Sequence, residues 1–212
     1  MTFVIWITWC VVHSLLNSNR IKLSVSQWLP GLFIYYRFFY NMVAIITLLL
    51  CLELTPKSSV KVVQWCGVWK IFQAFLWITA TGIVWLAMRI LGFWDFLGLT
   101  AFRLFQRRRR KPGVLLTYGI YAEVRHPLFL AGLLILWARD LSAIDLVVTM
   151  ILSAYLVLGA RIEERRLLKE FGLMYARYMN IVPGLVPRRI PHFGKLIQES
   201  RPRYRHEPEN TE

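Results

Sequence analysis

The chain has 212 residues, of which 57% are hydrophobic and only 18% charged, and its formal net charge is +14. A soluble domain is nearer about 45–50% apolar and about a quarter charged, so this composition indicates a membrane protein without a separate soluble domain. Nucleic-acid binding is disfavoured because the Lys and Arg residues stand in short blocks beside apolar runs, as in the cytoplasmic loops of membrane proteins.

The first half of the chain contains three apolar runs that predict membrane-spanning helices. The first run, 3–16, is short for a span, which needs about 20 residues. A polar link over 17–27 leads to the second run, 32–54, which is long enough to cross. The third run covers 62–91. These runs also hold the cysteines, whose spacing predicts neither a metal site nor a disulfide framework.

A strongly basic block and a long apolar run follow. The block, 101–113, has no acidic residue and predicts a cytoplasmic loop. The run, 128–160, is too long for one span of about 30 Å, so we expect a tight hairpin of two short helices split at Arg139 and Asp140. The predicted fold is all-α, a polytopic transmembrane helical bundle of about five spans with its N-terminus outside and its C-terminus in the cytoplasm.

Residues 161–178 predict a cytoplasmic amphipathic helix. At 100° per residue, Glu163 falls at the edge of its apolar arc and Glu164 near the middle. Because a buried carboxylate is costly unless paired, this pattern indicates a functional acid. The alternative is that both acids cap the first turn of the helix.

A second polar motif precedes the hairpin. Pro127 can begin a helix, since a proline at the first helical position loses no needed donor. Arg125 and His126 then lie just outside the N-terminus of that helix, where backbone donors attract an anion. The alternative is a charged anchor at the membrane interface.

These motifs occur in a fixed order around the hairpin: Gly113-Val114-Leu115-Leu116, Tyr121, Arg125-His126-Pro127, Glu163-Glu164, Phe171-Gly172, Tyr175 and Tyr178. The ordered set, within about 111–187, resembles the isoprenylcysteine carboxyl methyltransferase and phospholipid methyltransferase superfamily of membrane enzymes. The resemblance implies S-adenosyl-L-methionine as cofactor. The implied cofactor-binding residues are Gly113, Val114, Leu115, Leu116, Tyr121, His126, Pro127, Leu128, Phe129, Glu163 and Glu164.

Within this set the resemblance implies particular roles. Glu163 matches the acid that holds the amino group of the cofactor, although the helical wheel favours Glu164 for burial, and both stay candidates. Arg125 and His126 are the candidate catalytic residues, with Arg125 meeting the cofactor carboxylate or polarising the acceptor. The isoprenylcysteine enzymes have an Arg a few residues before the acidic pair. Here 158–160 lacks it, which argues against a prenylated protein as substrate.

The first half has a resemblance of its own. His13-Ser14, Arg20, Tyr36-Arg37 and Tyr40-Asn41 are similar to the NnrU-type membrane domain, which also forms the N-terminal half of membrane thiol methyltransferases that act on small thiols such as methanethiol. Arg37 and Asn41 share a helix face, and His13 is expected to face them. The candidate substrate residues are His13, Arg37, Asn41 and Arg161. The alternative role for the first three is hydrogen bonding between helices.

The chain therefore divides into an NnrU-like region, 1–100, a cofactor-binding region, 101–190, and a polar tail, 191–212. The function expected is methyl transfer from S-adenosyl-L-methionine to a small thiol or lipid-like acceptor in a bacterial inner membrane. The alternatives are an NADPH-dependent membrane reductase related to sterol reductases and a non-enzymatic NnrU-type protein. Membrane lipids are the expected partners, and no nucleic acid or metal is expected.

Overall fold

The computed structural model describes residues 1–99 and 115–187, where the regular structure is helical apart from one isolated bridge between Val63 and Leu141. The predictions for the basic block at 101–113 and for the tail at 191–212 fall outside these residues. In chain order the helices are α1 (Thr2–Leu16), α2 (Asn19–Trp28), η1 (Phe33–Tyr35), α3 (Tyr36–Leu54), α4 (Trp69–Leu91), α5 (Phe93–Leu97), η3 (Gly119–Ala122), α7 (Pro127–Trp137), α8 (Ala143–Phe171) and α9 (Leu173–Ile181).

Three of the described helical segments are long and apolar enough to cross a membrane: Phe33–Leu54, α4 and α8. Most of their side chains are not buried inside the protein, with 6%, 11% and 17% of the respective apolar windows buried. An apolar surface of this extent is suited to lipid rather than water, so the chain is a membrane protein. Helices α1 and α7 are apolar but shorter, so the count of five spans and the orientation of the termini stay predictions.

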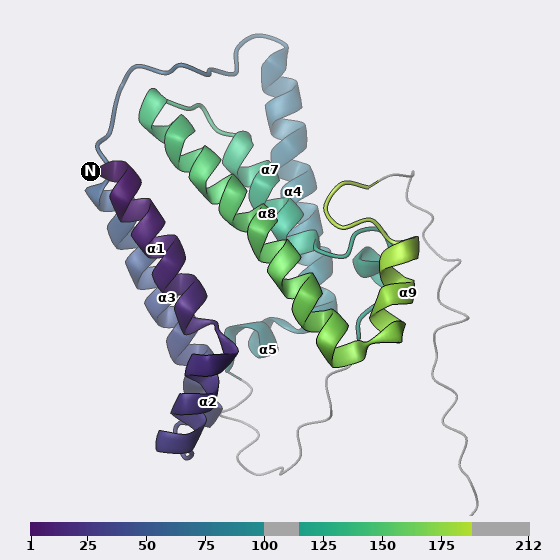
Figure 1. Ribbon diagram of the computed structural model, residues 1–212. Coiled ribbons are helices and arrows are strands. Elements are labelled where there is room, and N and C mark those ends of the chain that lie inside the picture. Colours follow the sequence, from purple (N-terminus) through teal and green to yellow (C-terminus); the bar gives the residue numbers. More distant parts are fainter. Residues whose placement is uncertain (100–114, 188–212) are drawn as a thin grey trace, which may run out of the picture.

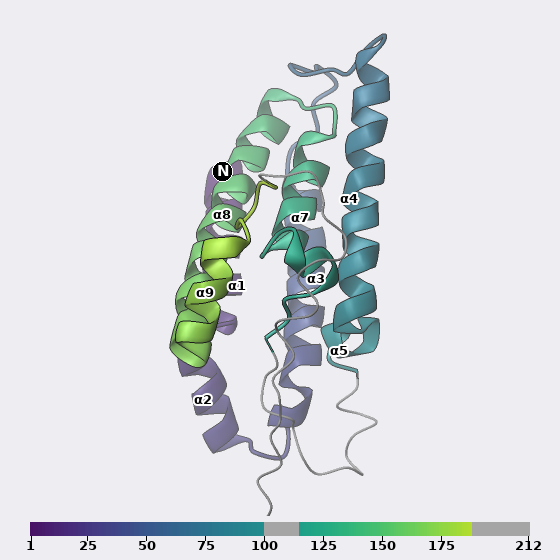
Figure 2. The ribbon, with the colours of Figure 1, turned by 90° about the vertical axis from the view of Figure 1, so that its right-hand side faces the viewer.

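The five long or apolar helices pack in the order α3, α1, α8, α7, α4 (Figure 1). Helices α1, α4 and α8 run in one direction, and α3 and α7 run in the other (Figures 1 and 2). Helices α2, α5 and α9 therefore gather at one end of the bundle, here called the α9 end. The chain's N-terminus and the α7–α8 turn lie at the opposite end, here called the N-terminal end.

A small core near the N-terminal end holds the first half of the chain against the second. Trp6, Cys51 and Val148 come from α1, α3 and α8 and form one buried cluster. The indole nitrogen of Trp6 donates a hydrogen bond of 3.0 Å to the Thr55 hydroxyl, so the largest side chain of the cluster has its polar atom satisfied, as burial requires.

The predicted split of the hairpin is confirmed, with α7 ending before and α8 beginning after it. Only α7 is short, because α8 has 29 residues and does not end at the expected residue 160. A capping box begins α8: the Ser142 hydroxyl accepts from the backbone nitrogen of Asp145, and the Asp145 carboxylate accepts from that of Ser142. The carbonyl of Ala138 in the turn accepts hydrogen bonds of 3.0 Å from Gln73 and Trp77 of α4. These bonds attach the hairpin to its neighbour.

Two predictions in the first half were wrong. The expected polar link at 17–27 forms α2, which begins where the Ser18 hydroxyl accepts from the backbone nitrogen of Ile21. The expected helix over 62–91 begins only at Trp69. The preceding segment is extended because the backbone nitrogens of Val62 and Val63 both donate to the carbonyl of Leu141, at 2.8 and 3.0 Å.

The amphipathic helix expected over 161–178 is not a separate element. Its first half is the last part of α8, which continues unbroken to Phe171, and its second half lies in α9. The two helices meet at Gly172, whose φ of +53° and ψ of −127° lie outside the helical region and suit glycine. With 29 residues, α8 is longer than a hydrocarbon core of about 30 Å at about 1.5 Å per residue, so its end reaches past the apolar layer.

Candidate functional site

Four charged or titratable residues from two distant parts of the chain meet at the α9 end: Arg125, His126, Glu163 and Glu164. Pro127 is the first residue of α7 and His126 directly precedes that helix, as the sequence predicted. The acidic pair comes from the last turns of α8. The continuity of α8 through this point removes the alternative in which the acids cap a free helix N-terminus.

The guanidinium of Arg125 lies at the centre of the cluster. Its Nε donates to Glu164 Oε1 at 3.0 Å, and its Nη2 donates to the same oxygen. Its Nη1 donates to the carbonyls of Met179, at 3.0 Å, and Val182. The side chains of Arg125 and Glu164 are only 10% and 17% exposed, so this is a buried, charge-assisted set of hydrogen bonds that joins α8, α9 and the start of α7.

The segment after α9, Val182–Gly184, closes over this pair. The backbone nitrogens of Arg125 and His126 donate to the carbonyls of Pro183, at 2.9 Å, and Gly184, at 3.1 Å. A Cβ at Gly184 would lie 3.3 Å from Nη2 of Arg125 and 3.5 Å from Oε1 of Glu164, so glycine permits the close approach. Sequence reasoning missed this segment, although Pro-Gly directly after a helix marks a turn.

His126 lies between the two carboxylates and is only 4% exposed. Its Nε2 is 3.3 Å from Glu164 Oε1, and its Nδ1 is 3.6 Å from Glu163 Oε2. The ring of Phe129 meets the imidazole edge to face, with centroids 5.6 Å apart. The Glu163 side chain is 45% exposed, so it is the accessible carboxylate of the pair.

Buried tyrosines cover one side of the cluster. The hydroxyl of Tyr178 donates to the carbonyl of Tyr121. The hydroxyl of Tyr175 is buried near Arg125 and Glu164. The Arg125 guanidinium is close enough to lower the pKa of Tyr175, but no described group meets the hydroxyl at the distance and angle of a hydrogen bond. Burial, and then the charge of Glu163, raises the pKa of Tyr121 to about 12. Burial, followed by the charge of Glu164, raises the pKa of Tyr175 to about 12, so both hydroxyls are neutral at physiological pH.

Several predicted cofactor residues surround this cluster. Leu115 packs against the buried Tyr175–Tyr178–Val182 cluster, and Leu116 is half-buried beside it in the sequence. Pro127 is buried and Leu128 half-buried in the first turn of α7. Gly113 and Val114 lie outside the described residues.

The candidate substrate residues have other surroundings. His13 stacks on Trp9, and its Nε2 lies 2.6 Å from the Tyr40 hydroxyl. Asn41, one position further along α3, donates to the carbonyl of Phe96 in α5 at 3.1 Å. Consecutive helical residues point about 100° apart, so the partner of His13 is Tyr40 rather than the expected Asn41. Arg161 is exposed on α8. His13 and Asn41 thus make hydrogen bonds between helices, which was the alternative role expected for them.

Comparisons with known proteins find one protein family and several methyltransferases that are similar to this chain. A family model described as "Protein of unknown function (DUF1295)" matches residues 19–182. A methanethiol S-methyltransferase from Pseudomonas sp. is 33% identical over 121 residues, which are 55% of this chain and 45% of that protein. Methanethiol S-methyltransferase 2 of Bradyrhizobium diazoefficiens is 43% identical over 70 residues, 32% of this chain and 27% of that protein.

A third relative, the methanethiol S-methyltransferase of Pseudomonas deceptionensis, is 29% identical over 154 residues, 63% of this chain and 58% of that protein. The chain thus spans less than two thirds of the length of these relatives. No solved structure matches the chain significantly.

Proposed function

We propose that this chain, a member of the DUF1295 family of proteins of unknown function, is a membrane methyltransferase that uses S-adenosyl-L-methionine as the methyl donor. The observation that carries the proposal is the cluster of Arg125, His126, Glu163 and Glu164. In this cluster the Glu164 carboxylate is buried against Arg125, and the Glu163 carboxylate is half-exposed. The relatives above are all methanethiol S-methyltransferases, which supports methyl transfer as the function.

The two carboxylates suit different tasks. Glu164 accepts two hydrogen bonds from Arg125 and lies 3.3 Å from His126, so its negative charge is already compensated. Glu163 is 45% exposed and its contact with His126 is longer, 3.6 Å. Glu163 is therefore the carboxylate that can take up the positively charged amino group of the cofactor. The sequence resemblance implies the same role for Glu163. The burial of Glu164 agrees with its position on the helical wheel.

The surrounding groups fit such a cofactor. The buried Tyr175 hydroxyl has no hydrogen-bond partner among the described residues, and a polar ligand would supply one. His126, Phe129 and Tyr121 provide an imidazole and two aromatic faces beside Glu163. The cofactor, when bound, supplies an already activated methyl group. The tasks left to the protein are to hold both reactants in line and to keep water out.

Arg125 acts in this proposal as a positioning residue. All three of its nitrogens donate to Glu164 or to the carbonyls of Met179 and Val182, so it holds α9 and Val182–Gly184 over the site. We propose a small thiol or lipid-like molecule as the acceptor. A thiol reacts as its thiolate, which a nearby positive group or hydrogen-bond donor stabilises, and the imidazole of His126 lies in the site where it can do so.

Calorimetric titration of the purified protein in detergent with S-adenosylhomocysteine, beside NADPH, tests the function. We expect S-adenosylhomocysteine alone to bind. Glu163→Gln should abolish binding and keep the circular-dichroism spectrum and unfolding temperature of the parent. Binding of NADPH alone would move the protein to the reductases, and binding of neither by a folded sample would support a non-enzymatic protein. Normal binding by folded Glu163→Gln would remove Glu163 from the site.

A further inference from the structure

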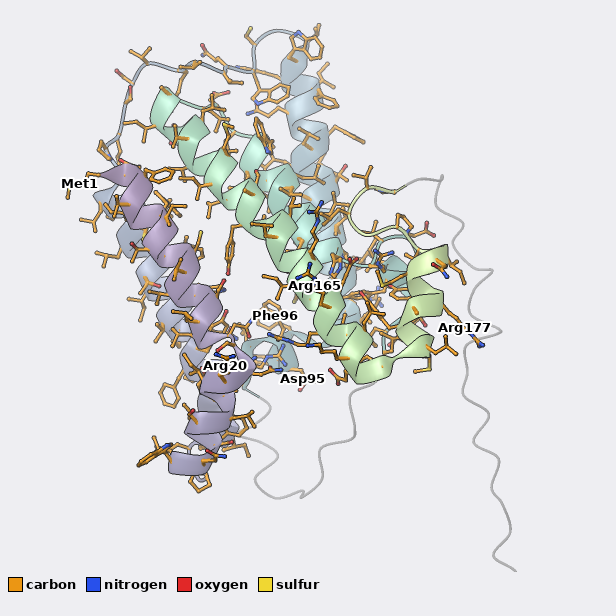
Figure 3. The ribbon with its side chains drawn as sticks, in the orientation of Figure 1. Met1, Arg20, Asp95, Phe96, Arg165 and Arg177 are labelled. Atoms are coloured by element: carbon orange, nitrogen blue, oxygen red, sulfur yellow. The ribbon has the colours of Figure 1, made fainter. Side chains whose placement is uncertain are left out.

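A pocket of about 250 Å³ lies at the N-terminal end of the bundle, between α1, α3, residues 55–61, the α7–α8 turn and the start of α8. This end is opposite to α9: Figure 3 shows Met1 at one end and Arg177 of α9 at the other. The pocket is therefore separate from the Glu163 cluster, and what it binds does not depend on the proposed function.

The pocket lies where the apolar part of the bundle meets a polar connection. Trp6, Leu52 and Val148 form its apolar side. Leu52 belongs to the membrane-spanning segment Phe33–Leu54, and Val148 to the first turns of α8. Residues 55–61 form its polar side. In a bilayer, the head groups of the lipids lie at this boundary between the hydrocarbon core and water.

Three cations and two carboxylates line the pocket: Lys57, Lys61, Arg139, Glu53 and Asp145. Lys57 pairs with Glu53 at 3.3 Å, and both side chains are exposed. The ammonium of Lys61 lies 3.5 Å from Asp145 Oδ2. Three positive and two negative groups leave a formal charge of +1, so the lining favours one additional negative charge.

Arg139 is the cation of this pocket that has no carboxylate within ion-pair distance among the described residues. Its Nη2 donates to the Thr149 hydroxyl at 3.2 Å, and its Nε donates to the Leu136 carbonyl at 3.4 Å. The neighbouring Asp140 carboxylate accepts instead from the backbone nitrogen of Trp65, at 3.0 Å. Most N–H groups of the guanidinium therefore have no acceptor in the described part of the chain.

Hydrogen bonds hold the polar side of the pocket in place. The backbone nitrogen of Val63, two residues after Lys61, donates to the carbonyl of Leu141 at 3.0 Å, and that of Leu141 donates back at 2.9 Å. The Asp145 oxygen that meets Lys61 also accepts from the backbone nitrogen and the hydroxyl of Ser142, at 2.9 and 2.7 Å. Because this oxygen serves three donors, Lys61 can take a further anionic partner.

We propose that this pocket binds the phosphate group of one anionic membrane phospholipid, with the Arg139 guanidinium and the Lys61 ammonium as its donors. A phosphodiester carries a single negative charge, which balances the formal charge of +1 of the lining. Its oxygens can accept the paired N–H groups of a guanidinium. The apolar side at Trp6, Leu52 and Val148 takes the first part of an acyl chain, which distinguishes a lipid from a soluble phosphodiester.

Titration of the purified full-length protein in dodecylmaltoside with palmitoyl-oleoyl phosphatidylglycerol, followed by native mass spectrometry and thermal unfolding, tests the site. Palmitoyl-oleoyl phosphatidylcholine has the same chains and no net charge, and glycerophosphoglycerol is the same head group without chains. We expect phosphatidylglycerol to bind and to raise the unfolding temperature, and the other two probes to have much smaller effects. Equal effects of the two lipids, or equal stabilisation by glycerophosphoglycerol, would overturn the proposal.

Two variants localise the effect. Arg139→Gln should weaken phosphatidylglycerol binding about tenfold, because it removes charge-assisted hydrogen bonds to the phosphate. The matched control is Lys70→Gln, which removes a positive charge from an exposed position at the start of α4, at the same end of the bundle but outside the pocket lining. The control should change binding less than about twofold. An equal loss in both variants would show general attraction to a positive surface and overturn the proposal.

Further variants separate binding from folding. Arg139→Lys keeps the charge and should retain more binding than Arg139→Gln, so an equal loss in the two folded variants would overturn the role of this charge. Leu52→Trp fills the apolar side of the pocket, leaves every cation in place and should weaken phosphatidylglycerol binding. Leu50→Trp, at an exposed position of α3 outside the pocket, is its control. Unchanged binding by Leu52→Trp would remove the acyl chain from the pocket and overturn the proposal of a lipid.

Discussion

At the scale of single residues, Arg125 connects more of the protein than any of its neighbours in the site. One guanidinium serves a carboxylate of α8, a carbonyl of α9 and a carbonyl of the segment that follows. Removal of such a group leaves buried acceptors without donors, and the unpaired groups are the main penalty. The stability of the α9 end should therefore depend on this side chain.

The first residue-scale prediction compares the two acids. Glu164→Gln should lower the free energy of unfolding by about 3 kcal/mol, because it leaves the buried Arg125 charge without its partner. Glu163→Gln should change it by less than about 1 kcal/mol, since that carboxylate is half-exposed and its only described ion pair is the long contact with His126. Denaturant unfolding in micelles measures both. A loss for Glu164→Gln as small as that expected for Glu163→Gln would show that the hydrogen bonds of Arg125 do not depend on Glu164.

The second residue-scale prediction compares two buried tyrosines of α9. Tyr178→Phe should cost about 1 kcal/mol, because its hydroxyl donates to the carbonyl of Tyr121. Tyr175→Phe should be neutral or slightly stabilising, because the buried hydroxyl that it removes has no hydrogen bond among the described residues. Thermal unfolding of the two variants in parallel checks this order. The reverse order would mean that the Tyr175 hydroxyl has a partner.

Sequence reasoning reached part of this site. Helical periodicity placed Glu164 within an apolar arc and Glu163 at its edge, and the exposures of 17% and 45% confirm that order. It could not identify Arg125 as the partner of Glu164, since the two residues are 39 positions apart. It could not predict that the carbonyls of Met179 and Val182 accept from Arg125 either, because every residue has a main-chain carbonyl and the sequence does not distinguish one from another.

At the scale of elements, the errors at the α8–α9 boundary and at α2 have one cause: single residues decide where these helices begin and end, and hydrophobic periodicity does not detect them. Periodicity continues from α8 into α9, so the pattern does not register a change of direction that depends on the φ and ψ of Gly172 alone. In the same way, α2 contains few apolar residues, and its start depends on a hydrogen bond from Ile21 to the Ser18 hydroxyl. The split of the run at 128–160 was predicted correctly, because that run is longer than one membrane span.

The element-scale prediction concerns Gly172. Gly172→Ala should destabilise the protein by about 1–3 kcal/mol, since a φ of +53° with a ψ of −127° is strained for any residue with a Cβ. No atom lies within 4 Å of the Cβ that the change would add, so the effect isolates the backbone.

Gly82, in the middle of α4, is the matched control. A Cβ there also meets no atom within 4 Å, and its backbone is helical, so Gly82→Ala should be neutral or stabilising. If both changes had the same effect in thermal unfolding, Gly172 would not be the conformational hinge between α8 and α9.

At the scale of the whole molecule, the arrangement of helices separates two ends of different character. The proposed active site lies at the α9 end, with α2, α5 and α9. The order of packing, α3, α1, α8, α7, α4, was not predictable from the sequence, because each apolar helix offers several faces to its neighbours. The five helices alternate in direction along the chain (Figures 1 and 2), and the number of spans and the orientation of the termini stay predictions.

The whole-molecule prediction tests the orientation. Cys66 is exposed at the N-terminal end, whereas Cys10 and Cys51 are buried. With the N-terminus outside, a membrane-impermeant maleimide should label Cys66 in intact cells. A variant with Cys66→Ser and the exposed Asn19→Cys should be labelled only after permeabilisation. The opposite pattern would reverse the topology.

The unbroken course of α8 has a consequence for the evolution of this family. The helix begins at the Ser142–Asp145 capping box and presents Glu163 and Glu164 after more than four turns without interruption. Insertion or deletion of one residue between these points would rotate both acids by about 100°, exchanging the one that faces Arg125 for another side chain. Length differences among homologues should therefore accumulate in connections such as 55–68, while this stretch of α8 keeps a constant number of residues.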